Sequence, residues 1–298
     1  MRGKILNALL ARMKTDERLF FLTGDMGINL VEPIEEAFPK RFLNVGIAEQ
    51  NLIGVAGGLC NMGFLPVVYT ISNFLIHRCL EQIRDDVVLH ENKVILLGTS
   101  AGFDNAPLGP THHIVDEWGM LKGLPGIDVY ATSSVEFAEK ALDLAIAREK
   151  SAYVRIAKGT PSIPGADGDF HYIEGQPGAP LLVSYGSLVQ ECLKARQARP
   201  ELGVLVMNKL HTLDAVKLSS LLAKHERVLV VEDHFPTTGL YSSVCQLAME
   251  QGLSITVQPV APEGYSLKVG QSSDFYHKLF SLDAAGILDR LAGSPRKG

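Results

Sequence analysis

The feature that most constrains this chain is a long stretch without any charged side chain, from residue 50 to residue 76. Such a stretch is either a membrane span or a pair of elements buried in a protein core. Asn51, Asn61 and Asn73 lie inside it, and holding these amides in lipid would cost free energy. Pro66 and several glycines also interrupt it. We therefore expect a buried, glycine-rich helix followed by a buried strand.

Short apolar runs alternate with helix-like segments around this stretch. The run at 18–23 (RLFFLT), which stops at Gly24-Asp25, has the length and composition of a strand buried in a parallel sheet. Strands that alternate with helices indicate a mostly parallel sheet covered by helices on both faces. We expect strands over 18–23, 42–45, 66–69, 93–98, 128–131 and 153–156, and helices over 32–38, 48–62, 73–90 and 134–148.

A second α/β pattern follows a segment rich in Gly, Pro and Asp, which has the composition of a linker. The sequence therefore predicts the α/β class with two doubly wound domains, each built on a mostly parallel sheet. The expected boundaries are 1–160 for the first domain, 161–180 for the linker and 181–298 for the second domain. In the second domain we expect strands over 181–184, 203–207, 227–232 and 254–260, and helices over 188–197, 215–225, 238–251 and 283–291.

The composition is that of a packed globular protein, with 46% hydrophobic and 20% charged residues. The formal net charge is −5, and the basic residues are scattered, so a nucleic-acid or anionic-membrane surface is not indicated. The four cysteines stand far apart without CxxC spacing, which is typical of reduced thiols in a cytoplasmic protein. They are Cys60, Cys79, Cys192 and Cys245.

The motif GIAEQN, residues 46–51, follows a predicted strand and opens the glycine-rich helix. Glu49 is the last charged residue before the uncharged stretch, so we expect its carboxylate to be poorly solvated. From the residues alone, a glutamate in the first turn of a helix that complements the helix dipole is the better interpretation.

The motif LGPTHH, residues 108–113, lies in a long loop after the fourth predicted strand. Ordered loops at this end of a parallel sheet commonly carry function. The two histidines supply groups that titrate near neutral pH. A metal site from His112, His113 and Asp116 is an alternative, but adjacent histidines in a loop point in different directions. The simpler interpretation of this motif is a polar loop whose histidines are hydrogen-bonded.

GIAEQN after one strand, YTISNF after the next and GPTHH in the following loop come in that order along the chain. Together they resemble the pyrimidine-binding domain of transketolases and of deoxyxylulose-phosphate synthases over residues 22–158. The segments VSYGSLVQECLKA, NKLHTLD and VVEDHFPTTGLYSSV resemble the C-terminal domain of the same enzymes. The resemblance covers nearly the whole chain, and the ordered set of motifs is far more specific than any one of them.

The resemblance implies that the chain binds thiamine diphosphate. Glu49 matches the glutamate that hydrogen-bonds the aminopyrimidine ring of this cofactor and promotes loss of the proton from the thiazolium carbon. Phe74 matches an aromatic residue that flanks the pyrimidine, although core packing is a competing interpretation. Asp25 matches an acidic position near the cofactor, and Ile47 falls in the same cofactor-binding motif.

The resemblance also implies substrate-binding residues. His112 matches the histidine that faces the substrate and handles hydroxyl protons, and is therefore expected to be catalytic. Lys158 aligns with an arginine that holds the substrate phosphate. Two positions depart from the family pattern: Leu108 replaces an aspartate that contacts an acceptor hydroxyl, and His77 replaces an aromatic residue or a phosphate-binding arginine. Both changes suggest a pocket shaped for a modified sugar acceptor, or a divergent binding mode.

One part of the family's cofactor site is missing from this sequence. Thiamine enzymes hold the diphosphate through Mg²⁺ (or Ca²⁺) with a GDG motif and a later Asn. Gly24-Asp25-Met26 lacks the second Gly, and Ala166-Asp167-Gly168-Asp169 in the expected linker is followed by no Asn until Asn208. We therefore expect no metal site here. A partner N-terminal subunit is expected to supply the GDG…N motif, in an α2β2 heterotetramer.

The expected activity is that of the C-terminal subunit of a split transketolase. It would transfer a two-carbon ketol unit from a ketose phosphate to an aldehyde acceptor, with small sugars as substrates and no nucleic acid or membrane as partner. Three alternatives remain open. They are the β subunit of a 2-oxoacid dehydrogenase E1 component, one half of a deoxyxylulose-phosphate synthase, and a non-catalytic regulatory subunit with the same fold.

Overall fold

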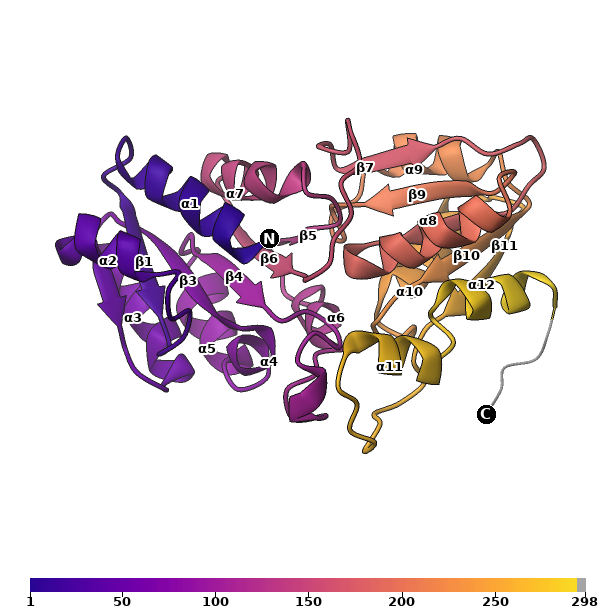
Figure 1. The fold of residues 1–298 in the computed structure, drawn as a ribbon. Helices are drawn as coiled ribbons and strands as arrows, with labels where there is room; N and C mark the ends of the chain where they lie inside the picture. The colour runs from indigo at the N-terminus through magenta and orange to yellow at the C-terminus, as the bar shows by residue number, and fades with distance from the viewer. Residues whose placement is uncertain (294–298) are drawn as a thin grey trace.

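The computed structural model describes residues 1–293, which form two α/β lobes lying side by side (Figure 1). Residues 294–298 of the expected second domain lie outside the described part of the chain. Each lobe is built on its own sheet, and helices cover both faces of each sheet. The predicted fold class, two α/β domains with mostly parallel sheets, is confirmed.

The first sheet has six strands in the order β2-β1-β3-β4-β6-β5, and every neighbouring pair is parallel. All six predicted strands are present, with ends shifted by a few residues at most. The strands are β1 Leu19–Thr23, β2 Phe42–Asn44, β3 Leu65–Ile71, β4 Ile95–Thr99, β5 Ile127–Ala131 and β6 Ser151–Ile156. The helices of this lobe are α1 Arg2–Met13, α2 Glu32–Ala37, α3 Glu49–Asn61, α4 Ser72–Ile76, α5 Leu80–Gln82, α6 Glu117–Leu121 and α7 Phe137–Ala147.

The uncharged stretch folds as predicted into helix α3 followed by strand β3. Alternate residues of β3 face opposite sides of the sheet: Val67 and Tyr69 pack with α1 and α7, whereas Val68 packs with α3 and α4. Burial on both faces explains why the strand carries no charge. No helix among the described residues is long and apolar enough to cross a membrane.

The predicted single helix over 73–90 is wrong in detail. The segment is divided into α4, α5 and a π-helical turn, Ile83–Leu89, because the backbone at Cys79 leaves the helical region. The π-helical turn lies directly on α3, where a Cβ on Gly57 would come within 2.9 Å of the carbonyl oxygen of Asp86. Glycine at 57 therefore allows this close approach.

The second sheet has five strands in the order β11-β10-β8-β9-β7. Its first strand in sequence, β7 (Phe170–Ile173), lies inside the segment predicted as a linker and pairs antiparallel with β9. The linker prediction is thus wrong for these residues: Gly, Pro and Asp on both sides concealed an edge strand. The other strands are β8 Leu181–Ser184, β9 Gly203–Met207, β10 Arg227–Val231 and β11 Thr256–Val260.

Helices α8 and α12 cover one face of the second sheet, and α9 and α10 cover the other (Figure 1). A short helix, α11, follows the loop after β11 and was not predicted from the sequence. The helices of this lobe are α8 Val189–Ala198, α9 Ala215–Leu222, α10 Leu240–Glu250, α11 Ser273–Leu279 and α12 Ala284–Leu291.

A buried ionic network joins the two lobes. Arg155, on β6 of the first lobe, donates to Glu117 at 2.6 Å and forms an ion pair with Asp233 of the second lobe at 3.0 Å. All three side chains are at most 4% exposed. Close by, Tyr185 accepts a hydrogen bond from the indole of Trp118, so the network continues across the interface.

Candidate active site

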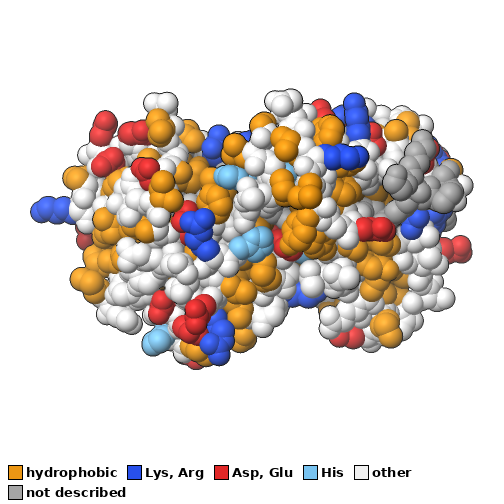
Figure 2. All heavy atoms as spheres, turned by 90° about the horizontal axis from the view of Figure 1, so that it is seen from below, with side chains coloured by type: hydrophobic (Ala, Val, Ile, Leu, Met, Phe, Trp, Pro, Cys, Tyr) orange, Lys and Arg blue, Asp and Glu red, His pale blue; other side chains and the backbone are white. Residues whose placement is uncertain are grey.

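The predicted site residues gather around the carboxyl ends of the first sheet. Asp25 follows β1, Glu49 begins the helix after β2, Phe74 follows β3, and His112 lies in the loop after β4. In parallel sheets the carboxyl ends of neighbouring strands meet at one edge, which is where ligands bind. Figure 2 shows histidine side chains and hydrophobic side chains at the junction of the two lobes on the face seen from below Figure 1.

Glu49 is the first residue of α3 and is only 2% exposed. Arg78 donates from Nη1 to its Oε2 at 2.7 Å. Among residues 1–293, no other group hydrogen-bonds this carboxylate. The expectation of a poorly solvated carboxylate is therefore met, with one addition: an arginine from the segment between α4 and α5 neutralises it. Oε1 is left for a further donor.

Phe74 lies between this ion pair and His112. The guanidinium of Arg78 stands 4.4 Å from the centre of the Phe74 ring, and His112 meets the same ring edge-on with centroids 5.1 Å apart. Both contacts use the quadrupole of the aromatic ring. The half-buried Phe74 thus contacts both His112 and the arginine that pairs with Glu49.

His112 and His113 point in different directions, as the sequence predicts. His113 is buried edge-on against the stacked rings of Phe103 and Tyr276, whose centroids lie 5.3 and 4.5 Å from its own. Burial lowers the pKa of His113. No group of three or more His, Cys, Asp or Glu side chains in the described part of the chain could hold a metal ion.

His77 lies one helical turn after Asn73, and both of its ring nitrogens are hydrogen-bonded. Nδ1 is 2.6 Å from Oδ1 of Asn73, and Nε2 is 2.8 Å from Oδ1 of Asp116. Its hydrogen bond with Asp116 raises the pKa of His77, although burial opposes the increase. Tyr265, from the second lobe, donates to the other oxygen of Asp116.

The loops after β1 and β2 form the border of the site next to Glu49. Asn44 connects them by accepting hydrogen bonds from the N–H groups of Asp25 and Gly46, both at 2.9 Å. Ile47 is 78% exposed at this border.

Lys158 and Leu108 lie at the same edge of the sheet, farther along it. The exposed ammonium of Lys158 donates to the carbonyl of Asp104 at 3.1 Å, and its backbone N–H donates to the carboxylate of that residue. Burial raises the pKa of Asp104 to about 7. Leu108 is 56% exposed. The glycine after it lies near Val269, so the second lobe borders this loop as well.

Three residues around the site were missed by sequence reasoning, Asn73, Arg78 and Tyr265, and a fourth, Asp116, was considered only as a ligand of the alternative metal site. Arg78 looked like an ordinary surface charge, and only the fold reveals the hydrogen-bond partners of both charged residues. One signal was available for Asn73, since an amide inside an otherwise uncharged buried stretch needs hydrogen-bond partners. Its side chain donates to the carbonyls of Thr111 and His113, and so holds the GPTHH loop against α4.

Comparisons with known families agree with this geometry. Residues 1–161 match the family described as "Transketolase, pyrimidine binding domain", and residues 179–287 match "Transketolase, C-terminal domain".

Among curated proteins, an apulose-4-phosphate transketolase subunit from Actinobacillus succinogenes is 33% identical over 272 residues, which cover 87% of this chain and 86% of the relative. The protein of the same name from Phocaeicola vulgatus is 24% identical over 297 residues, covering 96% and 94%. The 1-deoxy-D-xylulose-5-phosphate synthase of Rhodopirellula baltica is 30% identical over 253 residues, but these cover 81% of this chain and only 39% of the synthase.

Among solved structures, a "split gene transketolase, inactive beta4 tetramer" superposes with a TM-score of 0.84 at 22% identity, covering 98% of this chain and 97% of that chain. Transketolase from Leishmania mexicana superposes with a TM-score of 0.77 at 18% identity, covering 97% of this chain and 44% of that one. The fold is therefore shared with both. With its matched domains and its relatives of similar length, this chain belongs to the transketolase family and comprises the pyrimidine-binding and C-terminal domains found in split transketolases.

Proposed function

We propose that this chain is the C-terminal subunit of a two-chain, thiamine diphosphate-dependent transketolase. The enzyme would transfer a two-carbon ketol unit from a ketose phosphate to an aldehyde acceptor. The observation that supports this most is the geometry around Glu49: a buried carboxylate, a ring at Phe74 and an imidazole at His112 stand together at the ligand-binding edge of the sheet.

The residues present fit the pyrimidine half of thiamine diphosphate. Oε1 of Glu49 is left to accept a hydrogen bond from a ring nitrogen, and the exposed Ile47 offers an apolar contact at the border of the site. When bound, the cofactor supplies the electron sink for cleavage of the ketose carbon–carbon bond.

Each residue of this chain then has a separate task. Glu49 holds a proton at the aminopyrimidine ring from a buried position, where a hydrogen bond is strong. Phe74 orients the flat ring by packing against it. His112, fixed against Phe74, is placed to move protons at substrate hydroxyl groups. Asp25 stands at the rim near the cofactor, and Lys158 offers a positive charge to a substrate phosphate.

The remaining part of the site has to come from a second chain. The described residues offer no metal-binding cluster, and the sequence lacks the GDG…N motif. We propose that a partner N-terminal subunit supplies Mg²⁺ and the diphosphate contacts, and that two such pairs form an α2β2 heterotetramer. Four free cysteines, all at least partly buried, support a cytoplasmic location.

The acceptor is proposed to be a modified sugar phosphate. Leu108 places an exposed apolar side chain where transketolases that act on ordinary sugar phosphates carry an aspartate. The names of two relatives support this, since both are subunits of transketolases for apulose 4-phosphate. If xylulose 5-phosphate and ribose 5-phosphate were used with ordinary kcat/KM values, this assignment would be wrong.

The decisive experiment measures thiamine diphosphate binding by calorimetry with Mg²⁺, first on this chain alone and then on its mixture with a partner bearing GDG…N. Binding is expected in the mixture only. Glu49→Gln should lower kcat by at least 100-fold. Glu36→Gln, at an exposed position of α2, is the matched control and should leave kcat unchanged. A Glu49→Gln enzyme with full activity would refute the proposed role.

A further inference from the structure

A chain of four hydrogen-bonded side chains runs from the active-site loop to the second lobe. Asn73 binds His77, His77 binds Asp116, and Asp116 accepts from Tyr265. The first three residues belong to the pyrimidine-binding domain. Tyr265 lies in the loop between β11 and α11 of the C-terminal domain, so both domains take part in one arrangement next to Phe74 and His112.

The hydrogen-bond partners determine the charge of His77. Nδ2 of Asn73 donates to two backbone carbonyls, those of Thr111 and His113, so the amide is oriented with Oδ1 toward His77. Nδ1 of His77 therefore faces an acceptor and must carry a proton. Nε2 faces a carboxylate oxygen of Asp116 and must carry a proton as well. An imidazole with protons on both nitrogens is a cation.

The carboxylate of Asp116 is held in its charged form beside His77. Burial alone would raise its pKa, but hydrogen bonds from His77 and Tyr265 outweigh the effect and hold the pKa of Asp116 below its usual range. Its side chain is only 17% exposed, and each oxygen has its own donor. Tyr265 thus fixes the second oxygen, so that the first stays directed at His77.

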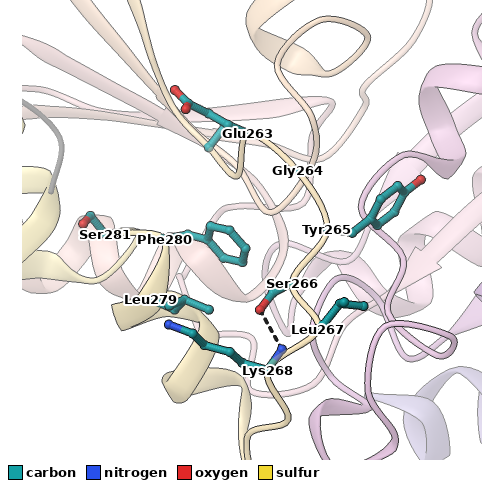
Figure 3. Close-up of a pocket in the computed structure, with 10 residues that line it drawn as sticks. Glu263, Gly264, Tyr265, Ser266, Leu267, Lys268, Leu279, Phe280 and Ser281 are labelled. Carbon is teal, nitrogen blue, oxygen red and sulfur yellow. Dashed lines mark hydrogen bonds between the residues drawn. The ribbon is translucent and has the colours of Figure 1, made fainter. Parts of the chain in front are cut away.

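Figure 3 shows how the C-terminal domain delivers Tyr265. The loop 263–268 lines a pocket of about 520 Å³ together with Leu279, Phe280 and Ser281. Tyr265 points away from Phe280, toward the first lobe. Tyr265 is thus one of the residues lining this pocket, and its hydroxyl reaches Asp116 of the first lobe.

We propose that Asn73 and Asp116 hold His77 as an imidazolium at neutral pH, and that Tyr265 of the C-terminal domain is a positioning residue for this cation. Both N–H groups of His77 are used within the protein, yet a third of the side chain is exposed. The cation is therefore fixed in orientation by contacts from both domains, while part of its ring stays open beside the candidate active site.

The charge state can be measured on this chain alone. Histidine labelled with ¹⁵N gives two nitrogen signals per ring, whose shifts distinguish the imidazolium from either neutral tautomer, and His77→Gln assigns the signals. At pH 7.5 both nitrogens of His77 are expected to be protonated, with a titration midpoint above the ordinary value of about 6.5. The charged groups that act on His77 are Asp116 and Glu117, and Tyr265 is hydrogen-bonded to Asp116. Arg78 and His112 both contact the ring of Phe74, three residues before His77.

Two conservative variants test the chain of contacts. Asp116→Asn removes the carboxylate and should lower the midpoint of His77. Tyr265→Phe should lower the midpoint of His77 by less, because this substitution removes only the hydroxyl group that holds Asp116 in place. A neutral His77 at pH 7.5 in the unaltered chain overturns the proposal. A midpoint unmoved by Tyr265→Phe overturns the part assigned to the C-terminal domain.

Discussion

Replacing Arg155 by methionine should be among the most destabilising single changes in this chain. Met keeps most of the length and apolar volume of the arginine stem but removes the cation. Glu117 and Asp233 would then stay buried without a positive charge beside them, at exposures of 0% and 4%. Removing one partner from a buried ionic group leaves an uncompensated buried charge, because water cannot reach it.

The magnitude follows from this burial. Breaking a buried pair costs about 3–5 kcal/mol. We expect the upper part of that range, since Arg155 serves two carboxylates and donates in addition to the carbonyl of Ile114. The matched control is Arg12→Met. Arg12 also forms a two-point contact with a carboxylate, Asp143, but both side chains are 40% exposed, and surface pairs of this kind contribute about 1 kcal/mol or less.

Urea unfolding followed by tryptophan fluorescence is the appropriate assay. The chain contains a single tryptophan, Trp118, which is buried beside the network and so reports on the interface between the lobes. The free energy of unfolding of a chain of this size falls by on the order of 3 kcal/mol per M urea. The urea midpoint of Arg155→Met should therefore lie more than about 1 M below that of the unaltered chain. Neutralising the carboxylates as well, with Glu117→Gln and Asp233→Asn, should restore part of the loss. Equal midpoints for Arg155→Met and Arg12→Met would refute this reasoning.

Two further predictions concern backbone geometry and pH. Gly102→Ala should destabilise the protein by several kcal/mol, on the order of 3, because φ is +55° and the new Cβ would lie 1.8 Å from Oδ2 of Asp233. Gly178→Ala, at φ +77° in open space, should cost about 1 kcal/mol, and thermal unfolding of both variants compares them. The pKa of His77 is raised and that of Asp116 is lowered in the folded chain. The His77–Asp116 pair therefore contributes its full stabilisation to the folded chain between about pH 4 and 6.5. This stabilisation is lost as pH rises through the folded-state pKa of His77 or falls through that of Asp116. Unfolding at pH 6 and pH 9 should show Asp116→Asn costing more at pH 6; an equal cost would contradict the linkage.

Strands β1, β3, β4, β5 and β6 could be predicted because burial on both faces leaves a plain pattern of short apolar runs. The edge strand β7 could not, since one of its sides has no neighbouring strand and its residues are all half-buried. The prediction of helices failed where tertiary contacts override local helix propensity. The segment 73–90 has helical periodicity throughout, yet Asn73 and Gly57 draw its two halves into different packing arrangements.

For the site, the sequence identified the groups that chemistry requires but not the groups that hold them. Glu49 and His112 lie in motifs with a recognisable order, and the structure brings both next to Phe74. Their roles in catalysis stay predictions. Arg78 and Asp116 carry no comparable signal, because a charged residue on a helix or in a loop is usually solvated. Only the folded chain shows that each of them meets a partner far away in sequence.

These missed residues share a physical property that explains why the C-terminal domain matters to the site. Each pairs across segments that the fold brings together: Arg78 with Glu49, and Asp116 with both His77 and Tyr265. A charge at the rim of a ligand site has an effect only if it is kept in place, since a free side chain is surrounded by water and screened by salt. Tyr265 keeps Asp116 in place from the second lobe. The C-terminal domain is therefore, on this geometry, part of the electrostatic environment of the candidate site.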